Sequence, residues 1–194
     1  MSDAPPPSER LDYEPLAVAH TPALSAWSDP QLYRWIGTAP TIAELAMRIE
    51  RITTRPPPAG EIWRNWVARR RADGACVGVV EATVHGDADP RAPCRAPSSR
   101  SRGEDRVRGA RAHLAYFIFT AFQRQGYARE ACAAAIAHLH DAYDVDDVVA
   151  SVDTRNTASQ RLLDSLQFVR DAQPVASSID DVPSRDYVYR LTLG

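Results

Sequence analysis

The sequence predicts an α/β fold, in which helices pack against a mixed β-sheet. One observation is the order of the expected elements along the chain: β, α, α, β, β, β, α, β, α, β, β. Another is the stretch Tyr116–Glu130, where the hydrophobic period changes from about two to about 3.6, so that strand, turn and helix follow without a gap. A third is size, because 194 residues, 44% hydrophobic and 25% charged, suit one domain, which we place at residues 10–194.

Composition argues against several classes of function. The formal charge of −2 disfavours a general nucleic-acid binder. All 23 basic residues are arginine, so the chain cannot use a Schiff-base lysine or a P-loop lysine. The three cysteines match no metal-binding or redox spacing, which favours a reducing compartment. No segment has the pattern of a signal peptide or a membrane span, so we expect a cytoplasmic protein that does not bind membranes.

The N-terminal part is expected to contain one strand and three helical segments. Residues 1–9 are polar and proline-rich and should form a disordered leader. Arg10–Leu16 alternates polar and apolar residues, as a first strand does. His20–Ile36 holds two short helical pieces separated by an Asp-Pro pair, and Thr41–Ile52 begins with a capping box and continues with apolar residues at helical spacing.

The middle of the chain predicts a β-hairpin followed by an insertion. Ile62–Arg70 and Cys76–His85 read as strands joined by a tight turn. Gly86–Arg111 is rich in proline, serine, arginine and glycine and almost lacks large apolar side chains, so it should be a mobile insertion between two strands. Its basic character would suit an acidic partner, although a solvated loop without function is the simpler interpretation.

The next segment combines a strand, a glycine turn and a helix. Ala112–Phe119 is the strand, and Gly126 opens a helix that extends to about Ala142 with a stripe of small residues toward the sheet. Glycine at such a turn allows a ligand to approach the backbone, and the free N–H groups of the first helical turn favour an anion such as phosphate. Taken alone, the pattern suits an ordinary structural turn equally well.

The remaining elements complete the sheet. Asp146–Val152 predicts a buried strand, and Asn156–Leu166 predicts a helix with leucines on its inner side. Phe168-Val169 starts a further strand, and Asp186–Leu193 alternates cleanly as the closing strand.

Two motifs about thirty residues apart now stand in a fixed structural order. The first is Gln123-x-x-Gly126-x-Ala128 at the strand-to-helix turn, and the second is Asn156-x-x-Ser159 followed by Arg-Leu-Leu. Together they resemble the GNAT acetyltransferases, and within them the subgroup related to the ribosomal-protein N-terminal acetyltransferases. Three stretches near the N-terminus also look like this subgroup: Glu9-Arg10-Leu11, Ser28-Asp29-Pro30 and Tyr33-Arg34-Trp35-Ile36.

The resemblance, which covers nearly the whole chain apart from residues 86–111, implies a fold and a cosubstrate. The expected fold is a mixed, mostly antiparallel sheet with helices on both faces and two central parallel strands that splay apart. The expected cosubstrate is acetyl-CoA, with its pantetheine arm paired to the central strand like an added strand and its pyrophosphate on the N–H groups of the turn. The cofactor-binding residues would be Phe117, Ile118, Phe119, Gln123, Arg124, Gln125, Gly126, Tyr127, Ala128, Arg129, Asn156 and Arg161.

Acetyl transfer to an amine needs a group that removes the acceptor's proton, a donor for the oxyanion, and a proton or hydrogen bond for the leaving thiolate. We expect Ser159 to serve the thiolate and a backbone N–H of the fourth strand to serve the oxyanion. The alternatives are that Ser159 is an ordinary residue of the first helical turn and that Asn156 is a plain N-cap. His113 and Glu81 are the candidates for the base, and a chain of water molecules without a dedicated base is the third possibility.

Two positions depart from the family pattern. Gln167 stands where the family usually has glycine before an aromatic residue, so the turn is either strained or of a different type. His113 stands where members of the subgroup often carry glutamate, which leaves the identity of the base open. His138 and His140 are two residues apart on a helix and do not share a face, so we expect no metal site.

The sequence therefore predicts an acetyl-CoA-dependent N-acetyltransferase without a metal, acting by direct attack of a primary amine in a ternary complex. The subgroup suggests a protein N-terminal α-amine as acceptor, and a small-molecule amine such as an aminoglycoside, a polyamine or an amino acid is the alternative. A non-catalytic acyl-CoA-binding module is the rival from another class, because the subgroup glutamate is missing at position 113. We expect a monomer or homodimer with no nucleic-acid partner.

Overall fold

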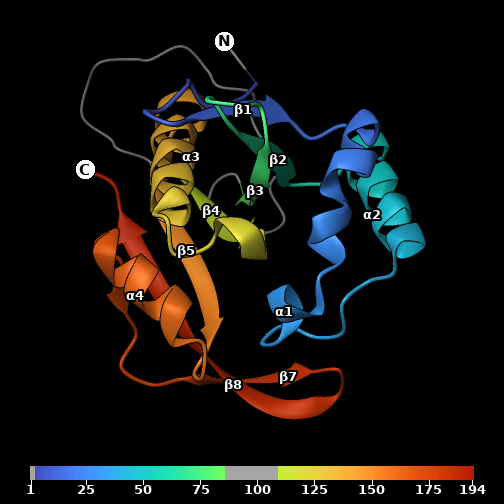
Figure 1. Cartoon of the computed structure of the whole chain (residues 1–194). Coiled ribbons are helices and arrows are strands. Elements are labelled where there is room, and N and C mark those ends of the chain that lie inside the picture. Colours follow the sequence, from blue (N-terminus) through green and yellow to red (C-terminus); the bar gives the residue numbers. More distant parts are fainter. Residues whose placement is uncertain (1–2, 86–108) are drawn as a thin grey trace.

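The computed structural model describes residues 3–85 and 109–194, and its centre is an eight-stranded sheet (Figure 1). The strand order is β1-β2-β3-β4-β5-β8-β6, with β7 paired to β8 off this path. Every pairing is antiparallel except that of β4 with β5. The strands are β1 (Leu11–Pro15), β2 (Glu61–Arg70), β3 (Cys76–His85), β4 (Ala110–Ile118), β5 (Val145–Asp153), β6 (Val169–Arg170), β7 (Val175–Ile179) and β8 (Val182–Thr192).

Helices cover both faces of this sheet, as the sequence predicts (Figure 1). One face carries α3 (Tyr127–Tyr143) and α4 (Thr157–Ser165). The other carries α2 (Ile42–Thr54), the short helix α1 (Pro30–Tyr33) and the 3-10 segment η1 (Val18–Ser28). A second 3-10 turn, η2 (Thr120–Phe122), follows β4. None of the helices in the described ranges is long and apolar enough to cross a bilayer.

Each face has its own buried core. On the α3 face, the small residues Ala131, Cys132 and Ala135 are almost fully buried, which lets the helix approach the sheet closely. On the α2 face, Trp27 is completely buried and its ring packs edge-on against Phe117 of β4 at 5.4 Å. Burial of apolar surface on both sides fixes the sheet between the two helical layers.

The predicted capping box at the start of α2 is confirmed. The Thr41 hydroxyl accepts a hydrogen bond from the Glu44 N–H at 3.3 Å, and the Glu44 carboxylate accepts one from the Thr41 N–H at 2.8 Å. Two N–H groups that would lack an acceptor at the helix end are thereby satisfied.

The N-terminal residues are more ordered than their composition suggests. Residues 1–2 of the predicted disordered leader lie outside the described residues, and within residues 3–9 the chain contacts the sheet and α3 at Asp3, Ala4 and Ser8. Ala4 is buried, the carbonyl of Asp3 accepts a hydrogen bond from the Trp66 indole at 2.8 Å, and the Ser8 hydroxyl donates to Glu130 at 2.7 Å. These partners are far away in the sequence, so no local pattern reveals them. Most of the predicted insertion, residues 86–108, lies outside the described residues, and its end, Ala110–Arg111, belongs to β4.

Two features of the C-terminal part differ from the simple sequence pattern. The chain forms the extra strand β7, and β8 starts at Val182 rather than Asp186, because this hairpin is largely exposed and shows no regular alternation. Gln167 has a φ of 66°, so the turn keeps the left-handed conformation with glutamine in place of glycine.

The end of β5 is held by a buried carboxylate. Asp153, whose side chain is 1% exposed, accepts hydrogen bonds from the Arg155 guanidinium at 2.7 and 2.9 Å and from the Ser184 hydroxyl at 2.7 Å. The Arg155 guanidinium, followed by Ser184 and the Arg155 N–H, holds the pKa of this carboxyl far below its usual range.

We expect Asp153→Asn to lower the free energy of unfolding by about 2–3 kcal/mol at neutral pH, because hydrogen bonds to a charged group are lost from a buried site. A carboxyl whose pKa is depressed by folding stabilises the protein above the unfolded-state pKa and loses this effect as the pH falls toward the folded-state value. The difference between wild type and variant should therefore shrink below about pH 4. Urea denaturation at pH 7 and at acid pH measures this difference in the free energy of unfolding.

Asp171→Asn is the control, because it removes an exposed partner of Arg190 and should change stability little. An equal loss of stability in both variants would contradict the stabilising role of the buried Asp153.

Candidate active site

The site begins where the two parallel strands separate. β4 and β5 pair from Ala110 with Val145 to His113 with Val149, and beyond this point they have no register in common although β4 continues to Ile118 and β5 to Asp153. The predicted splay of the central strands is thus present. It leaves the β5-facing backbone groups of the second half of β4 without a strand partner, so an extended ligand can pair with them.

The end of β4 leads into the glycine turn. Gly126 is the N-cap of α3, with a φ of 85°, and Arg124 also has a positive φ of 60°. Among the described residues, no acceptor is found for the N–H groups of the run 124–129, whereas the Glu130 N–H donates to the Gly126 carbonyl. A run of free N–H groups at the start of a long helix favours an anion.

Some side chains around this turn hold its conformation, and others are exposed beside it. Gln123 donates through its amide to the Ile118 carbonyl at 3.0 Å, and Gln125 donates to the Ala121 carbonyl at 3.1 Å, so both hold the turn rather than point freely to solvent. Tyr127 is buried, with its ring edge-on to Phe122. Arg124 and Arg129 are exposed beside the turn, where they can approach a phosphate. Ala128 keeps the first helical turn free of bulk.

The predicted pantetheine strand places its side chains on opposite faces. Phe117 contacts Trp27 and Tyr33 on the α2 face, with ring centroids at 5.4 and 5.8 Å, while Ile118 belongs to the core on the α3 face. Phe119 is buried among the residues of the α2 face. The side chains are therefore taken up by the two cores, and the backbone is free only in part, because the Phe119 N–H donates to the Val77 carbonyl at 2.9 Å and the Ile118 carbonyl accepts from Gln123.

The N-terminus of α4 lies beside this region. Asn156 is its N-cap, and its side-chain oxygen accepts a hydrogen bond from the Ser159 N–H at 3.1 Å, which is the geometry of an ordinary cap. The hydroxyl of Ser159 lies next to that of Tyr116, which is buried and has no hydrogen-bond partner among the described residues. Burial raises the pKa of Tyr116, and the proximity of Ser159 partly offsets this. Arg161 is exposed on the outer side of α4.

Both candidate bases line one cavity on the α2 face. The cavity has a volume of about 350 Å³. Its walls come from β2, β3, β4, β5 and α2, on both sides of the point where β4 and β5 separate. The lining residues are Arg48, Ile52, Trp63, Asn65, Glu81, Thr83, His113, Leu114, Ala115, Val149 and Ser151.

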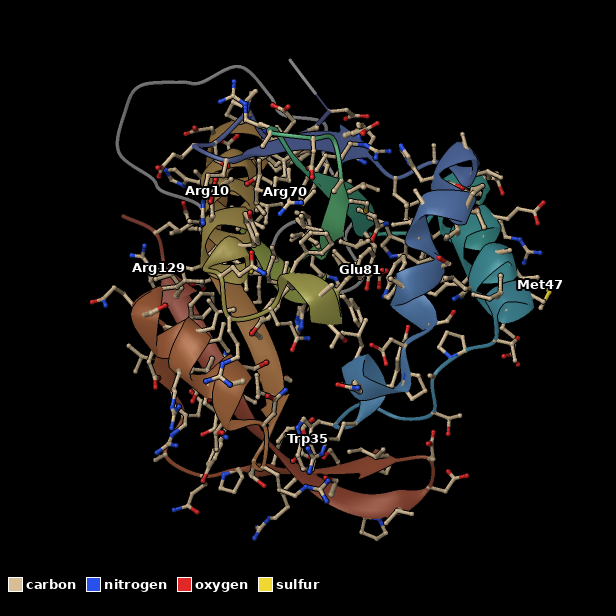
Figure 2. The ribbon with its side chains drawn as sticks, in the orientation of Figure 1. Arg10, Trp35, Met47, Arg70, Glu81 and Arg129 are labelled. Carbon is tan, nitrogen blue, oxygen red and sulfur yellow. The ribbon has the colours of Figure 1, made fainter. Side chains whose placement is uncertain are left out.

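Glu81 is not a free carboxylate. The Arg48 guanidinium on α2 donates to both of its oxygens, at 2.6 and 2.8 Å, and the Glu81 side chain is only 15% exposed. Figure 2 shows Glu81 between the sheet and the helices of the α2 face. Because both oxygens already accept hydrogen bonds, Glu81 is less available to take a proton than an unpaired carboxylate. Arg48 was not singled out from the sequence, since its partner is 33 residues away and no motif links them.

His113 is the more accessible candidate. It lies opposite Thr83 in the register of β3 and β4, and its ring stands edge-on to His85 at 5.3 Å. Partial loss of hydration lowers the pKa of His113, and the nearby His85, Arg111 and Arg190 lower it further, while Glu61 acts in the opposite direction. The imidazole is therefore neutral, and able to accept a proton, at lower pH than an ordinary histidine.

Within residues 3–85 and 109–194, no group of three or more His, Cys, Asp and Glu side chains has the geometry to hold a metal ion. The site instead combines unpaired backbone donors, the two candidate bases and one hydroxyl near the start of α4.

Comparison with known proteins agrees with this architecture. The model of the acetyltransferase (GNAT) domain matches residues 10–169, whereas no protein of curated function matches the sequence significantly. Similar solved structures include a GNAT-family acetyltransferase from Bacillus anthracis (14% identity, 97% of this chain and 98% of that chain, TM-score 0.70). They also include RimL, a ribosomal L7/L12 α-N-protein acetyltransferase in complex with coenzyme A (14% identity, 98% of each chain, TM-score 0.71). A third is the Salmonella typhimurium acetyl transferase that modifies the N-terminal serine of L7/L12 (14% identity, 98% of this chain and 99% of that chain, TM-score 0.73).

The family follows from the domain model, which spans most of the chain, and the chain with its splayed sheet shares the fold of these solved structures. The protein therefore belongs to the GNAT family of N-acetyltransferases.

Proposed function

We propose that this enzyme transfers the acetyl group of acetyl-CoA to a primary amine, by direct attack in a ternary complex. The observation that carries the proposal is the continuity of the site along β4. Free N–H groups at the Gly126 turn, an unpaired strand edge and a cavity containing His113 follow one another along this strand. The pyrophosphate would bind at the turn, the pantetheine arm along the strand edge, and the amine in the cavity.

The residues of the site account for each proton. His113 accepts one proton of the ammonium group and releases it to solvent, and the neutral amine attacks the thioester carbonyl to form the carbon–nitrogen bond of a tetrahedral intermediate. As this intermediate collapses, the carbon–sulfur bond breaks, the nitrogen loses its second proton through Ser159, and the sulfur gains one. A backbone N–H of β4 on the side that faces β5 donates to the developing oxyanion. Ser159 donates a hydrogen bond or a proton to the departing thiolate.

For the acceptor, we favour a protein N-terminal α-amine. Two of the similar structures are described as acting on the N-terminus of a ribosomal protein. The cavity supplies uncharged hydrogen-bonding side chains, Asn65, Thr83 and Ser151, which suit a peptide backbone. Its carboxylate, Glu81, is neutralised by Arg48, so a polyamine or an aminoglycoside would find no unpaired carboxylate among the described lining residues.

Product analysis across a panel of acceptors tests this proposal. We expect acetyl-CoA-dependent acetylation of short peptides with a free α-amine, detected by mass spectrometry and by thiol release. The same peptides with a blocked α-amine and a free lysine should give no product, because only the α-amine is the acceptor. Product with polyamines, aminoglycosides or amino acids alone would overturn the peptide assignment. Binding of acetyl-CoA without product from any amine would support the rival, a non-catalytic acyl-CoA-binding module.

A further inference from the structure

The N-terminal segment is fastened to the glycine turn by one arginine. Arg10 precedes β1, and Figure 2 shows its side chain beside α3. Its Nε donates to Glu130 at 2.8 Å, its backbone N–H donates to the same carboxylate at 2.6 Å, and Nη1 donates to the Gln125 carbonyl at 2.9 Å. The guanidinium also lies over the Tyr127 ring, at 4.6 Å from its centroid. A segment 120 residues away in the sequence thus contacts the turn from several directions.

The arrangement leaves part of the guanidinium free. Among the described residues, Nη2 has no hydrogen-bond partner, and it lies 3.2 Å from the position that a Cβ would take at Gly126. The side chain is 42% exposed, so solvent or a ligand can reach it. Nη2 is therefore adjacent to Gly126, in the middle of the run 124–129 whose N–H groups are free.

Glu130 explains why Arg10 stays in place. Its carboxylate is only 12% exposed and accepts hydrogen bonds from Arg10 and from the Ser8 hydroxyl. The pKa of Glu130 is lowered, since these hydrogen bonds and the charge of Arg10 outweigh the effect of partial burial. A guanidinium has five donors in a fixed planar fork, so it can bind a carboxylate and a carbonyl and still present one amino group.

We propose that Arg10 is a positioning residue for the coenzyme. It holds the Gln125 carbonyl away from the anion, fixes the turn against Glu130, and presents Nη2 to the pyrophosphate. This inference rests on the proposed function, because it assigns a residue outside the turn motif to the pyrophosphate of the same cosubstrate. The N-terminal segment is then part of the coenzyme site rather than only the start of the sheet.

The test is a set of affinities for ligands with and without phosphates. Arg10→Gln should weaken binding of coenzyme A about 10- to 100-fold, because a charge-assisted hydrogen bond and the support of the turn are lost. Arg10→Lys should recover part of the loss, because it restores the charge but not the fork. Binding of S-acetylpantetheine, which has no phosphate, should stay the same in both variants. In steady-state assays the KM for acetyl-CoA should rise, while kcat and the KM for the amine change less than about threefold.

Arg71→Gln is the matched control. Arg71 lies close to the same N-terminal segment and is similarly exposed, but it pairs with Asp12 rather than with the turn. It should leave coenzyme A affinity unchanged. If Arg10→Gln lost affinity for S-acetylpantetheine as much as for coenzyme A, Arg10 would have a general structural role and the inference would be overturned. The same loss of coenzyme A affinity in Arg71→Gln would also overturn it. Unchanged coenzyme A affinity in Arg10→Gln would also overturn it, whereas a wild-type protein that binds no coenzyme A would refute the proposed function itself.

Discussion

Gly126→Glu is expected to abolish coenzyme A binding, with a loss of affinity of at least about 100-fold, equivalent to about 2.7 kcal/mol or more. Gly126 has a φ of 85°, a conformation that costs a residue with a side chain about 1 kcal/mol. A Cβ there would stand 3.2 Å from Nη2 of Arg10, so the added side chain enters the space next to the free N–H groups. Its carboxylate would occupy the donors meant for an anion and repel the pyrophosphate.

Gly74→Glu is the control for strain and charge. Gly74 also has a positive φ, 71°, and nothing lies within 4 Å of the position of its Cβ. This variant should be destabilised by a similar backbone effect yet bind coenzyme A as the wild type does. Isothermal titration calorimetry measures the coenzyme A affinity of both variants, and thermal unfolding confirms that both are folded. Retained affinity in Gly126→Glu would refute the phosphate-cradle hypothesis.

His113→Ala is expected to lower kcat by about 10²- to 10⁴-fold if this imidazole removes the acceptor's proton. Because the pKa of His113 is lowered below its ordinary value, the active, neutral form is present from mildly acidic pH upward. The acidic limb of the kcat/KM profile should therefore lie below about pH 6.5 in the wild type and disappear in His113→Ala. His85→Ala, which removes a neighbour that lowers this pKa, should shift the limb to higher pH.

Glu81→Gln separates the two candidate bases. With both oxygens bound to Arg48, Glu81 should act mainly on the shape of the cavity, so this variant should keep the acidic limb and lose less activity than His113→Ala. His20→Ala is the control for the loss of a histidine elsewhere, because His20 pairs with Glu14 and is not among the residues that line the cavity. A larger loss in Glu81→Gln than in His113→Ala would assign the base to Glu81. Full activity in both variants would point to a chain of water molecules.

Local patterns predicted the elements whose stabilising contacts are close in the sequence. The capping box of Thr41 and Glu44 spans three residues, and the cap of Asn156 on Ser159 spans three as well. The hairpin of β2 and β3 and the change of period at Tyr116–Glu130 are equally local. The exposed β7 escaped prediction because its side chains are not selected for burial, so its strand shows no regular alternation.

The α/β architecture and the strand–glycine–helix turn can be predicted from the sequence, because hydrophobic periods and hydrogen bonds within a few residues specify them. The family follows from the resemblance of two short motifs, at the turn and at the start of α4. The packing of distant segments sets which side chains share the site. It paired Glu81 with Arg48, left His113 accessible in the same cavity, and brought Arg10 to the turn at Gly126. These contacts join residues 33 and more than 100 positions apart, and they form only when the two helical layers close on the sheet. No local pattern carries that information, since each partner alone reads as an ordinary polar residue.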